Sequence, residues 1–149
     1  AVTAGTGQSF ATGAAFAPLT INGGLSVVES LPSDATQSFW NTTTNLIRPI
    51  GVQDTNTVRL SFTASGYSGV SPYIDVCLDI GGAIGEVWCN TMPLLKSGAD
   101  QNISVVIPFF AGSTFIVNGG TIKTRYAGGS GTLSIFKKTI FINRESKGS

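Results

Sequence analysis

The sequence predicts an all-β protein, an antiparallel β-sandwich or jelly roll with a flexible N-terminal arm. Only 11% of the 149 residues are charged and 19 are glycine, a composition that favours short strands and tight turns. No window keeps apolar residues at helical spacing over several turns. Apolar and polar residues instead alternate in many short segments. Regularly spaced segments of this kind are typical of two packed antiparallel sheets.

The clearest alternation runs from Tyr73 to Gly82. Successive side chains of a strand point to opposite faces of a sheet, so this segment predicts one aliphatic and one polar face. We expect the aliphatic face on the core and the polar face in solvent. The aliphatic face comprises Ile74, Val76, Leu78 and Ile80, and the polar face comprises Tyr73, Asp75, Cys77 and Asp79.

The other strands are predicted in chain order from the same pattern. Residues 18–28 resemble an opening hairpin, because Asn22-Gly23-Gly24 suits a turn that needs positive φ. Pro108-Phe109-Phe110 is expected to take the chain round a corner. In residues 84–90, we expect Val87 and Cys89 on one face, opposite Glu86 and Trp88. The remaining short strands or strand-like segments are 38–41, 46–47, 57–64, 103–107, 114–117, 121–126, 133–136 and 139–142.

Residues 1–17 form the predicted arm, residues 18–144 the jelly-roll domain and residues 145–149 a C-terminal tail. The arm is rich in Ala, Gly, Thr and Ser and cannot bury enough surface to fold alone. Its two aromatic residues, Phe10 and Phe16, are candidate anchors that become ordered against a partner or a neighbouring subunit. The alternative is a disordered terminus whose aromatic side chains lie on its own domain.

Positive charge gathers near the C-terminus. The formal net charge is only +1, which gives no general attraction to nucleic acid. A basic patch for an acidic partner is one interpretation, and solvated strand ends are the other. No segment approaches the roughly 20 apolar residues of a membrane span. The candidate docking patch comprises Lys123, Arg125, Lys137, Lys138 and Arg144.

The two cysteines, Cys77 and Cys89, have a spacing and strand phase that permit a disulfide across a hairpin. The first residues lack the basic and apolar regions of a secretion signal. We therefore expect two reduced, buried thiols that behave as small hydrophobic side chains.

Residues for catalysis or metal binding are few. The chain has no His, the commonest general base and metal ligand. Asp75 and Asp79 lie about 13 Å apart along a strand, further than the carboxyl pair of a glycosidase. No calcium-loop motif occurs, and two cysteines without His do not complete a zinc site. The sequence therefore predicts a protein that is not an enzyme, with no catalytic residue, cofactor or metal.

Several segments together resemble a domain of structural proteins from tailed bacteriophages. Their order and spacing carry the resemblance, which covers roughly residues 38–142. The segments are Ser38-Phe39-Trp40-Asn41, Val58-Arg59-Leu60-Ser61-Phe62, Ile74 to Gly82, Ile107-Pro108-Phe109-Phe110, Thr114-Phe115 and Asn118-Gly119-Gly120.

The resemblance implies a jelly roll similar to the tumour-necrosis-factor fold that assembles as a homotrimer on the virion. Because the glycine-rich arm precedes the domain without a fibre shaft, we expect a capsid cement (decoration) protein. It would be made in the host cytoplasm, bind the major capsid protein on the capsid surface, and contact neither nucleic acid nor membrane. The alternatives are the receptor-binding tip of a tail or head fibre, and a carbohydrate-binding module whose Trp40, Trp88 and Tyr67 stack on sugars.

Overall fold

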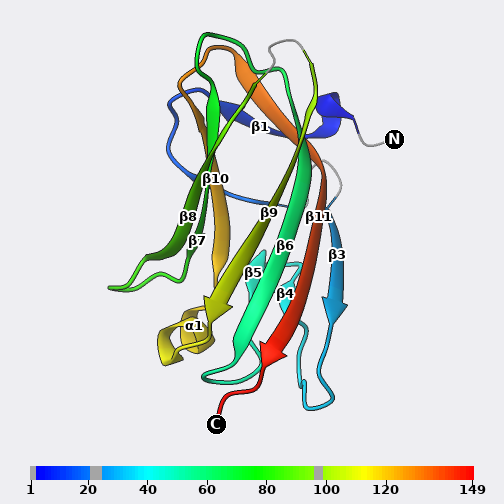
Figure 1. Cartoon of the computed structure of the whole chain (residues 1–149), viewed down its shortest axis with the longest axis vertical. Coiled ribbons are helices and arrows are strands. Elements are labelled where there is room, and N and C mark those ends of the chain that lie inside the picture. Colours follow the sequence, from blue (N-terminus) through cyan, green and yellow to red (C-terminus); the bar gives the residue numbers. More distant parts are fainter. Residues whose placement is uncertain (1–2, 21–24, 96–98) are drawn as a thin grey trace.

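The computed structural model of the chain is a sandwich of two β-sheets, here named sheet A and sheet B (Figure 1). The structure describes residues 3–20, 25–95 and 99–149. Sheet A has the strand order β1-β11-β6-β9, with β3 also paired to β11, and sheet B has the order β2-β10-β7-β8. The prediction of an all-β sandwich is confirmed.

Sheet A contains the three longest strands of the described residues, β6, β9 and β11. Its strands are β1 (Gln8–Ala11), β3 (Leu25–Ser30), β6 (Thr55–Ser65), β9 (Gln101–Phe110) and β11 (Thr132–Ser146). All neighbours are antiparallel except β3, which runs parallel to β11.

Sheet B and the remaining elements contain strands of eight residues or fewer. Sheet B comprises β2 (Ala17–Pro18), β7 (Tyr73–Asp79), β8 (Glu86–Pro93) and β10 (Thr121–Ala127). A two-stranded ribbon pairs β4 (Trp40–Asn41) with β5 (Leu46–Ile47). The helical elements are the 3₁₀ turn η1 (Ala4–Thr6) and the helix α1 (Ser113–Asn118).

The chain changes sheet at nearly every connection. Within the two large sheets, β7 and β8 are the one pair of consecutive strands that are also neighbours among the described residues. Successive crossings between two four-stranded paths are the topology of a jelly roll. Every other neighbouring pair is therefore brought together from distant parts of the sequence.

The core lies between the two sheets and is lined by the predicted alternating residues. Val58, Leu60 and Phe62 of β6 are buried, and Ile74, Val76 and Leu78 of β7 have no exposed surface. The predicted inner faces of both strands are confirmed. Burial of these side chains is the main term that stabilises the sandwich.

Residues 114–117, predicted to be a strand, belong instead to the helix α1. The Ile116 N–H donates to Gly112 O (3.1 Å) and the Gly119 N–H donates to Phe115 O (2.8 Å). The helix ends where Gly119 adopts a φ of 74°. Phe115 is buried and stacks on Phe109, with ring centroids 4.7 Å apart. The β-branched residues favour a strand, but burial of Phe115 at the end of the sandwich outweighs that preference.

The predicted hairpin over residues 18–28 is wrong in its pairing. Strand β2 joins β10 in sheet B, whereas β3 joins β11 in sheet A. The turn Asn22-Gly23-Gly24 lies outside the described residues. A turn sequence specifies a local reversal of the chain, but the partner of each strand depends on the rest of the fold.

Two other predicted breaks lie within continuous strands. Pro108 lies inside β9, an edge strand of sheet A, where a missing N–H is tolerated. Residues 133–136 and 139–142 belong to one strand, β11, with a register shift between Phe136 and Thr139. Lys137 has a φ of 51° at this bulge. The bulge changes the phase of β11, so that Lys138 points into the sandwich.

The predicted arm and tail both lie on the domain. Strand β1, which lies within residues 1–17, pairs with β11. Strand β2, which ends at Pro18, pairs with β10. At the other end, Gly148 N–H donates to Asp54 Oδ1 (2.8 Å) and Lys147 forms an ion pair with Asp34. The C-terminus lies at the end of the sandwich that carries α1 (Figure 1).

Candidate functional site

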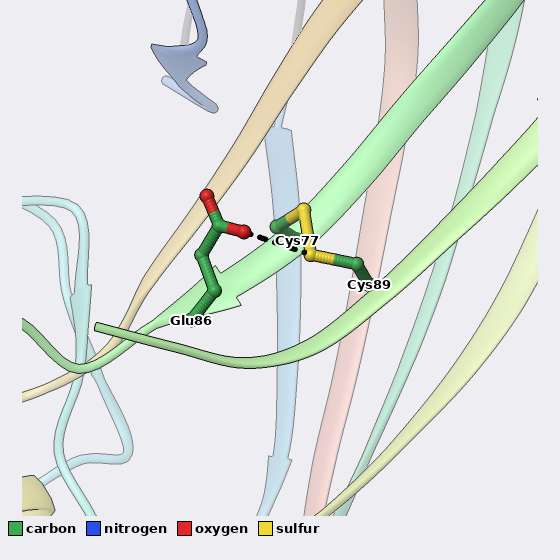
Figure 2. Close-up of side chains that lie close together, drawn as sticks. All are labelled: Cys77, Glu86 and Cys89. Atoms are coloured by element: carbon green, nitrogen blue, oxygen red, sulfur yellow. Dashed lines mark hydrogen bonds between the residues drawn. A yellow bond between two sulfur atoms is a disulfide. The ribbon is translucent and has the colours of Figure 1, made fainter. Parts of the chain in front are cut away.

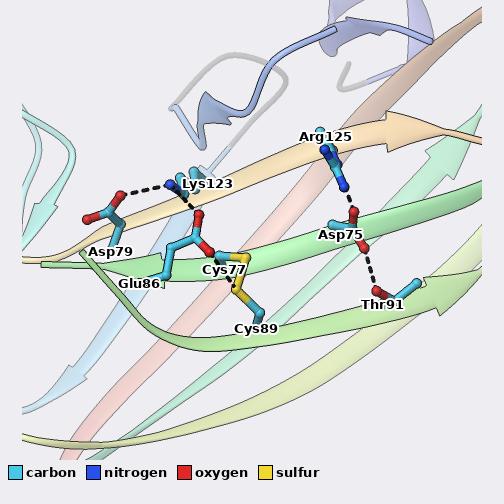
Figure 3. Close-up of a disulfide and its surroundings, with 8 residues drawn as sticks. All are labelled: Asp75, Cys77, Asp79, Glu86, Cys89, Thr91, Lys123 and Arg125. Atoms are coloured by element: carbon cyan, nitrogen blue, oxygen red, sulfur yellow. Dashed lines mark hydrogen bonds and ion pairs between the residues drawn. A yellow bond between two sulfur atoms is a disulfide. The ribbon is translucent and has the colours of Figure 1, made fainter. Parts of the chain in front are cut away.

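Charged side chains and a disulfide gather on the outer face of sheet B, over β8, β7 and β10 (Figure 3). The register places Cys89, Cys77 and Lys123 in one row across these strands. The next rows hold Thr91, Asp75 and Arg125 on one side, and Glu86, Asp79 and Thr121 on the other. Strand alternation on β7 and β10 therefore brings together residues that lie far apart in the sequence.

Cys77 and Cys89 form a disulfide, so the expectation of reduced thiols is wrong. The two residues are directly opposite each other in the β7/β8 pair, with Cα atoms 4.1 Å apart. This short separation is typical of the non-hydrogen-bonded pair of an antiparallel ladder, where side chains approach most closely. Cys77 is buried, as expected, but Cys89 is exposed on the edge strand.

Glu86 reaches the disulfide because β8 contains a bulge. The register passes from Leu78↔Trp88 to Asp79↔Glu86 and leaves Val87 without an opposite residue. Glu86 and Cys89 therefore share the outer face, contrary to the predicted alternation, and Trp88 packs against the core. Glu86 Oε2 lies 3.3 Å from Cys89 Sγ (Figure 2). A disulfide sulfur has no proton to donate, so this contact becomes a hydrogen bond only in the thiol form.

Lys123 holds two carboxylates at once. Its Nζ lies 2.7 Å from Asp79 Oδ2 and 2.7 Å from Glu86 Oε1. The hydrogen bonds to Asp79 and then to Glu86 raise the pKa of Lys123. The hydrogen bond from Lys123, followed by that from the Gly81 N–H, lowers the pKa of Asp79. Lys123 and Asp79 are therefore both charged at neutral pH.

Asp75 is almost completely covered on the same face. Arg125 Nε donates to Asp75 Oδ2 at 2.8 Å, and Thr91 Oγ1 donates to Asp75 Oδ1. This hydrogen bond with Asp75 raises the pKa of Arg125. The outer face of β7, which was predicted to lie in solvent, is thus only partly exposed, because side chains of β8 and β10 cover Asp75 and Cys77.

Phe16 lies above this charged surface. Its ring centroid is 5.1 Å from Lys123 Nζ and 4.8 Å from Arg125 Cζ, both within cation–π range. The ring also lines a cavity of about 340 Å³ together with Asp79, Asn118 and Lys123. Phe10, the other predicted anchor, is 5% exposed and belongs to the core. Of the two, only Phe16 is accessible to a partner without rearrangement.

The five predicted basic residues do not form one patch. Lys123 and Arg125 are paired on sheet B, and Arg144 pairs with Asp34 and Asp54 at the end of β11. Lys138 is 1% exposed and donates to Gln8 Oε1 at 3.2 Å. Burial lowers the pKa of Lys138 to about 8. Lys137 is exposed at the bulge, with its Nζ 5.9 Å from the ring centroid of Phe136.

The outer face of sheet A is different in composition. Its register rows run across β3, β11, β6 and β9 and consist largely of Ser, Thr and Asn with a few apolar side chains. Within these rows of described residues, Arg59 is the one charged side chain. The rows are Ser26-Thr139-Ser61-Ser104, Val28-Phe141-Arg59-Val106 and Ser30-Asn143-Thr57-Pro108.

The aromatic residues proposed for sugar stacking are not on an open surface. Trp40 and Tyr67 are buried, and Trp88 packs against the core. The alternation of residues 84–90 does not predict Glu86 as a neighbour of the cysteines, because a bulge places it there. The sequence offers a weak signal, since Gly85 directly precedes Glu86 and bends the chain at the start of β8.

Comparisons with models of known families and with curated proteins find no match to this sequence. Within residues 3–20, 25–95 and 99–149, no helix has the length and apolar character needed to cross a membrane.

Proposed function

We propose that the chain is a structural virion protein of a tailed bacteriophage, a trimeric cement protein that binds and stabilises the capsid shell. The observation that carries this proposal is the charge-poor outer face of sheet A. The location on a virion and the number of subunits are inferred from the sequence resemblance. The outer face of sheet A offers a surface through which subunits could associate.

The outer face of sheet A shares one property with an interface core, a low content of charged side chains, although it is richer in serine than such cores are. Such cores are depleted in charged side chains and enriched in apolar and aromatic ones. Val106 is 55% exposed and Phe110 is 61% exposed on the edge strand β9. Serine and threonine hydroxyls around them are small and cost little to desolvate compared with charges. Closed symmetry would bury this face in each subunit without leaving it open to further copies.

The disulfide supports a location outside the reducing cytoplasm after assembly. Disulfides persist in oxidising environments, including the surfaces of virions. Cys89 is on an exposed edge strand, where a reducing cytoplasm has access to it. The protein would then be made in the host cytoplasm as a dithiol and act on the particle as a disulfide.

Oligomeric state is the first test. We expect light scattering to give a mass near three times 15.4 kDa, about 46 kDa. Val106→Lys places a second cation beside Arg59 on the outer face of sheet A and should dissociate the trimer. Val87→Lys, on exposed β8, is the matched control and should leave the trimer intact. A stable wild-type monomer at micromolar concentration would contradict the proposal.

Capsid binding is the second test. Deleting residues 1–17 would remove β1 and half of β2, so loss of binding would not distinguish an anchor from a folding defect. Phe16→Ala leaves the core intact and should reduce binding to undecorated shells by about tenfold or more. Phe10→Ala should instead lower stability. Binding of wild-type protein to host cells but not to shells would favour the fibre-tip alternative.

A further inference from the structure

We propose that reduction of the Cys77–Cys89 disulfide creates a metal site on sheet B, in which the two cysteine thiolates and the Glu86 carboxylate bind a zinc-type divalent cation. The inference does not depend on the proposed virion function. It rests on the convergence of three ligand side chains at one point of the outer face (Figure 2).

The ligand atoms are already close together. One sulfur atom from each cysteine and one carboxylate oxygen of Glu86 all lie within 4.8 Å of one another. In a tetrahedral zinc site, two thiolates are about 3.8 Å apart, as follows from a metal–sulfur distance of about 2.3 Å. Cys77 and Cys89 face each other across a ladder pair with Cα atoms 4.1 Å apart, so side-chain rotation alone can separate the sulfurs that far.

Glu86 is oriented for this role by its second oxygen. Lys123 Nζ holds Oε1 at 2.7 Å, while Oε2 points to Cys89 Sγ at 3.3 Å (Figure 3). An outer partner that fixes a ligating carboxylate is typical of protein metal sites. Lys123 also bonds Asp79, so it can remain as a cation beside the anionic ligand set when Glu86 binds the metal.

The chemistry of the donors selects the class of metal. Two thiolates favour zinc and related borderline ions over calcium and magnesium, which prefer oxygen ligands. Three protein ligands would leave a fourth position for water, as in open zinc sites. The Glu86 side chain is 42% exposed, so the site is open to an entering ion.

Reduction is required because a disulfide supplies no thiolate ligand. A small thiol attacks the exposed Cys89 sulfur, and the Cys77 sulfur leaves as a thiolate. A second thiol resolves the mixed disulfide, so two thiols become one disulfide and both cysteines become thiols. Metal binding then displaces the two thiol protons. The loop between the cysteines is short, with a sequence separation of 12, so this cross-link contributes less stability than one that closes a long loop.

The disulfide and the bound metal would each cross-link β7 and β8, one in an oxidising and the other in a reducing environment. Strand β8 lies at the edge of sheet B, with β7 as its neighbour. The disulfide links the pair under oxidising conditions, and the bound metal would link the same residues under reducing conditions. The hairpin would therefore stay closed on both sides of a change in redox environment.

Cobalt(II) is the probe for this site. The full chain is reduced with a phosphine, which is then removed without oxygen, and Co²⁺ is added alone. We expect one equivalent of Co²⁺ to produce thiolate-to-cobalt charge-transfer absorption, and Zn²⁺ to displace it. Oxidised protein should show no such absorption. Glu86→Gln should weaken binding by about tenfold or more, whereas Glu145→Gln, an exposed carboxylate on β11, should have no effect.

Three results would overturn the proposal. One is the absence of charge-transfer absorption in reduced protein. Another is equal Co²⁺ affinity for wild type and Glu86→Gln, which would show that the carboxylate is not a ligand. The third is loss of the β-sheet circular dichroism spectrum on reduction that Zn²⁺ does not restore.

Discussion

The outer faces of sheet A and sheet B belong to one sandwich but differ in how they treat charge. On sheet B, Asp75 and Asp79 of the central strand are each held by a cation from β10. On sheet A, small hydroxyl and apolar side chains surround Arg59 in the described register rows, and the one carboxylate beside these rows is Glu145, which accepts a hydrogen bond from Asn143 Nδ2 at 3.0 Å. The inner faces of both sheets are largely apolar, so the difference does not come from the core.

The difference indicates separate roles. Partly buried charges are tolerated only when they are paired, and sheet B meets that condition with ion pairs on its own strands. The charged groups of its outer face therefore find their partners within one chain. Small neutral side chains cost little to bury, so the outer face of sheet A can be covered by another protein surface.

Leu78→Ala should have the largest effect, because it removes an inner-face side chain with no exposed surface. We expect a loss of about 2–5 kcal/mol in the free energy of unfolding. Asp79→Asn, one residue away on the outer face of sheet B, should cost less than about 1 kcal/mol. Urea denaturation of the two variants measures the difference, and equal losses would mean that the faces of β7 are assigned the wrong way round.

Lys138→Met tests a charged side chain that sheet A buries. The pKa of Lys138 is about 8 in the fold, against 10.5 for the unfolded residue. The folded protein disfavours the ammonium form, so stability should be lowest below pH 8 and rise between pH 8 and 10.5. The full difference corresponds to about 3 kcal/mol.

At pH 7 the methionine variant should therefore be more stable than wild type, by an amount reduced by the lost hydrogen bond to Gln8. Denaturation curves at pH 7 and pH 10.5 measure the change. The Lys138 amine donates to the neutral amide oxygen of Gln8, and this hydrogen bond supplies no negative charge to offset the penalty of burial. A variant less stable than wild type at both pH values would show that the amine is not penalised by burial.

Cys77→Ser combined with Cys89→Ser should lower stability by about 3 kcal/mol, the contribution expected from closing a short loop. Reductant should lower the wild type to a similar level in metal-free buffer and leave the double variant unchanged. Thermal denaturation with and without reductant is the measurement. If reductant left the melting temperature of the wild type unchanged, the disulfide would not stabilise sheet B.

Arg125→Met should have a smaller effect, about 1–3 kcal/mol, because it leaves the covered Asp75 carboxylate with only Thr91 as a side-chain donor. Ser61→Ala at an outward position of sheet A should change stability by less than about 0.5 kcal/mol. Adding Asp75→Asn to Arg125→Met should recover part of the loss. Similar effects at Arg125 and Ser61 would remove the distinction between the faces.

Acid should produce the smallest effect. The pKa of Asp79 is lowered by its hydrogen bond from Lys123, so this carboxylate stabilises the fold above its unfolded pKa of 3.8. That contribution is lost as the pH falls through the folded pKa, and partial exposure limits it to less than about 1 kcal/mol. Lys123→Met should flatten this part of the stability curve. An unchanged acid limb in the variant would show that the pair contributes nothing.

Much of the fold was predictable because period-two alternation reports directly on burial. The inner faces of β6 and β7 follow from it without further information. Strand partners were not predictable, since β2 and β3 are close in sequence but belong to different sheets. The helix α1 was missed because its β-branched residues favour a strand and only the burial of Phe115 outweighs them.

The candidate site shows the same limit. Asp75, Cys77 and Asp79 were correctly assigned to one face of a strand. Their partners Lys123 and Arg125 come from β10, whose register depends on the whole sandwich. Glu86 reaches the cysteines through a bulge, and a bulge changes the phase that alternation assumes. The local sequence pattern therefore predicts the central strand of the site, β7. The residues that β8 and β10 place beside it depend on the tertiary fold.

The bulge at Lys137 also gives the protein an internal reference for amine reactivity. Two lysines that are adjacent in sequence differ completely in access, since Lys137 is exposed and Lys138 is enclosed. An amine-reactive label at alkaline pH will modify Lys137 at the rate of any surface lysine. It can reach Lys138 only when the strands around it separate. Because both residues fall on one short peptide, a single mass spectrum records surface reactivity and the opening of the interior side by side.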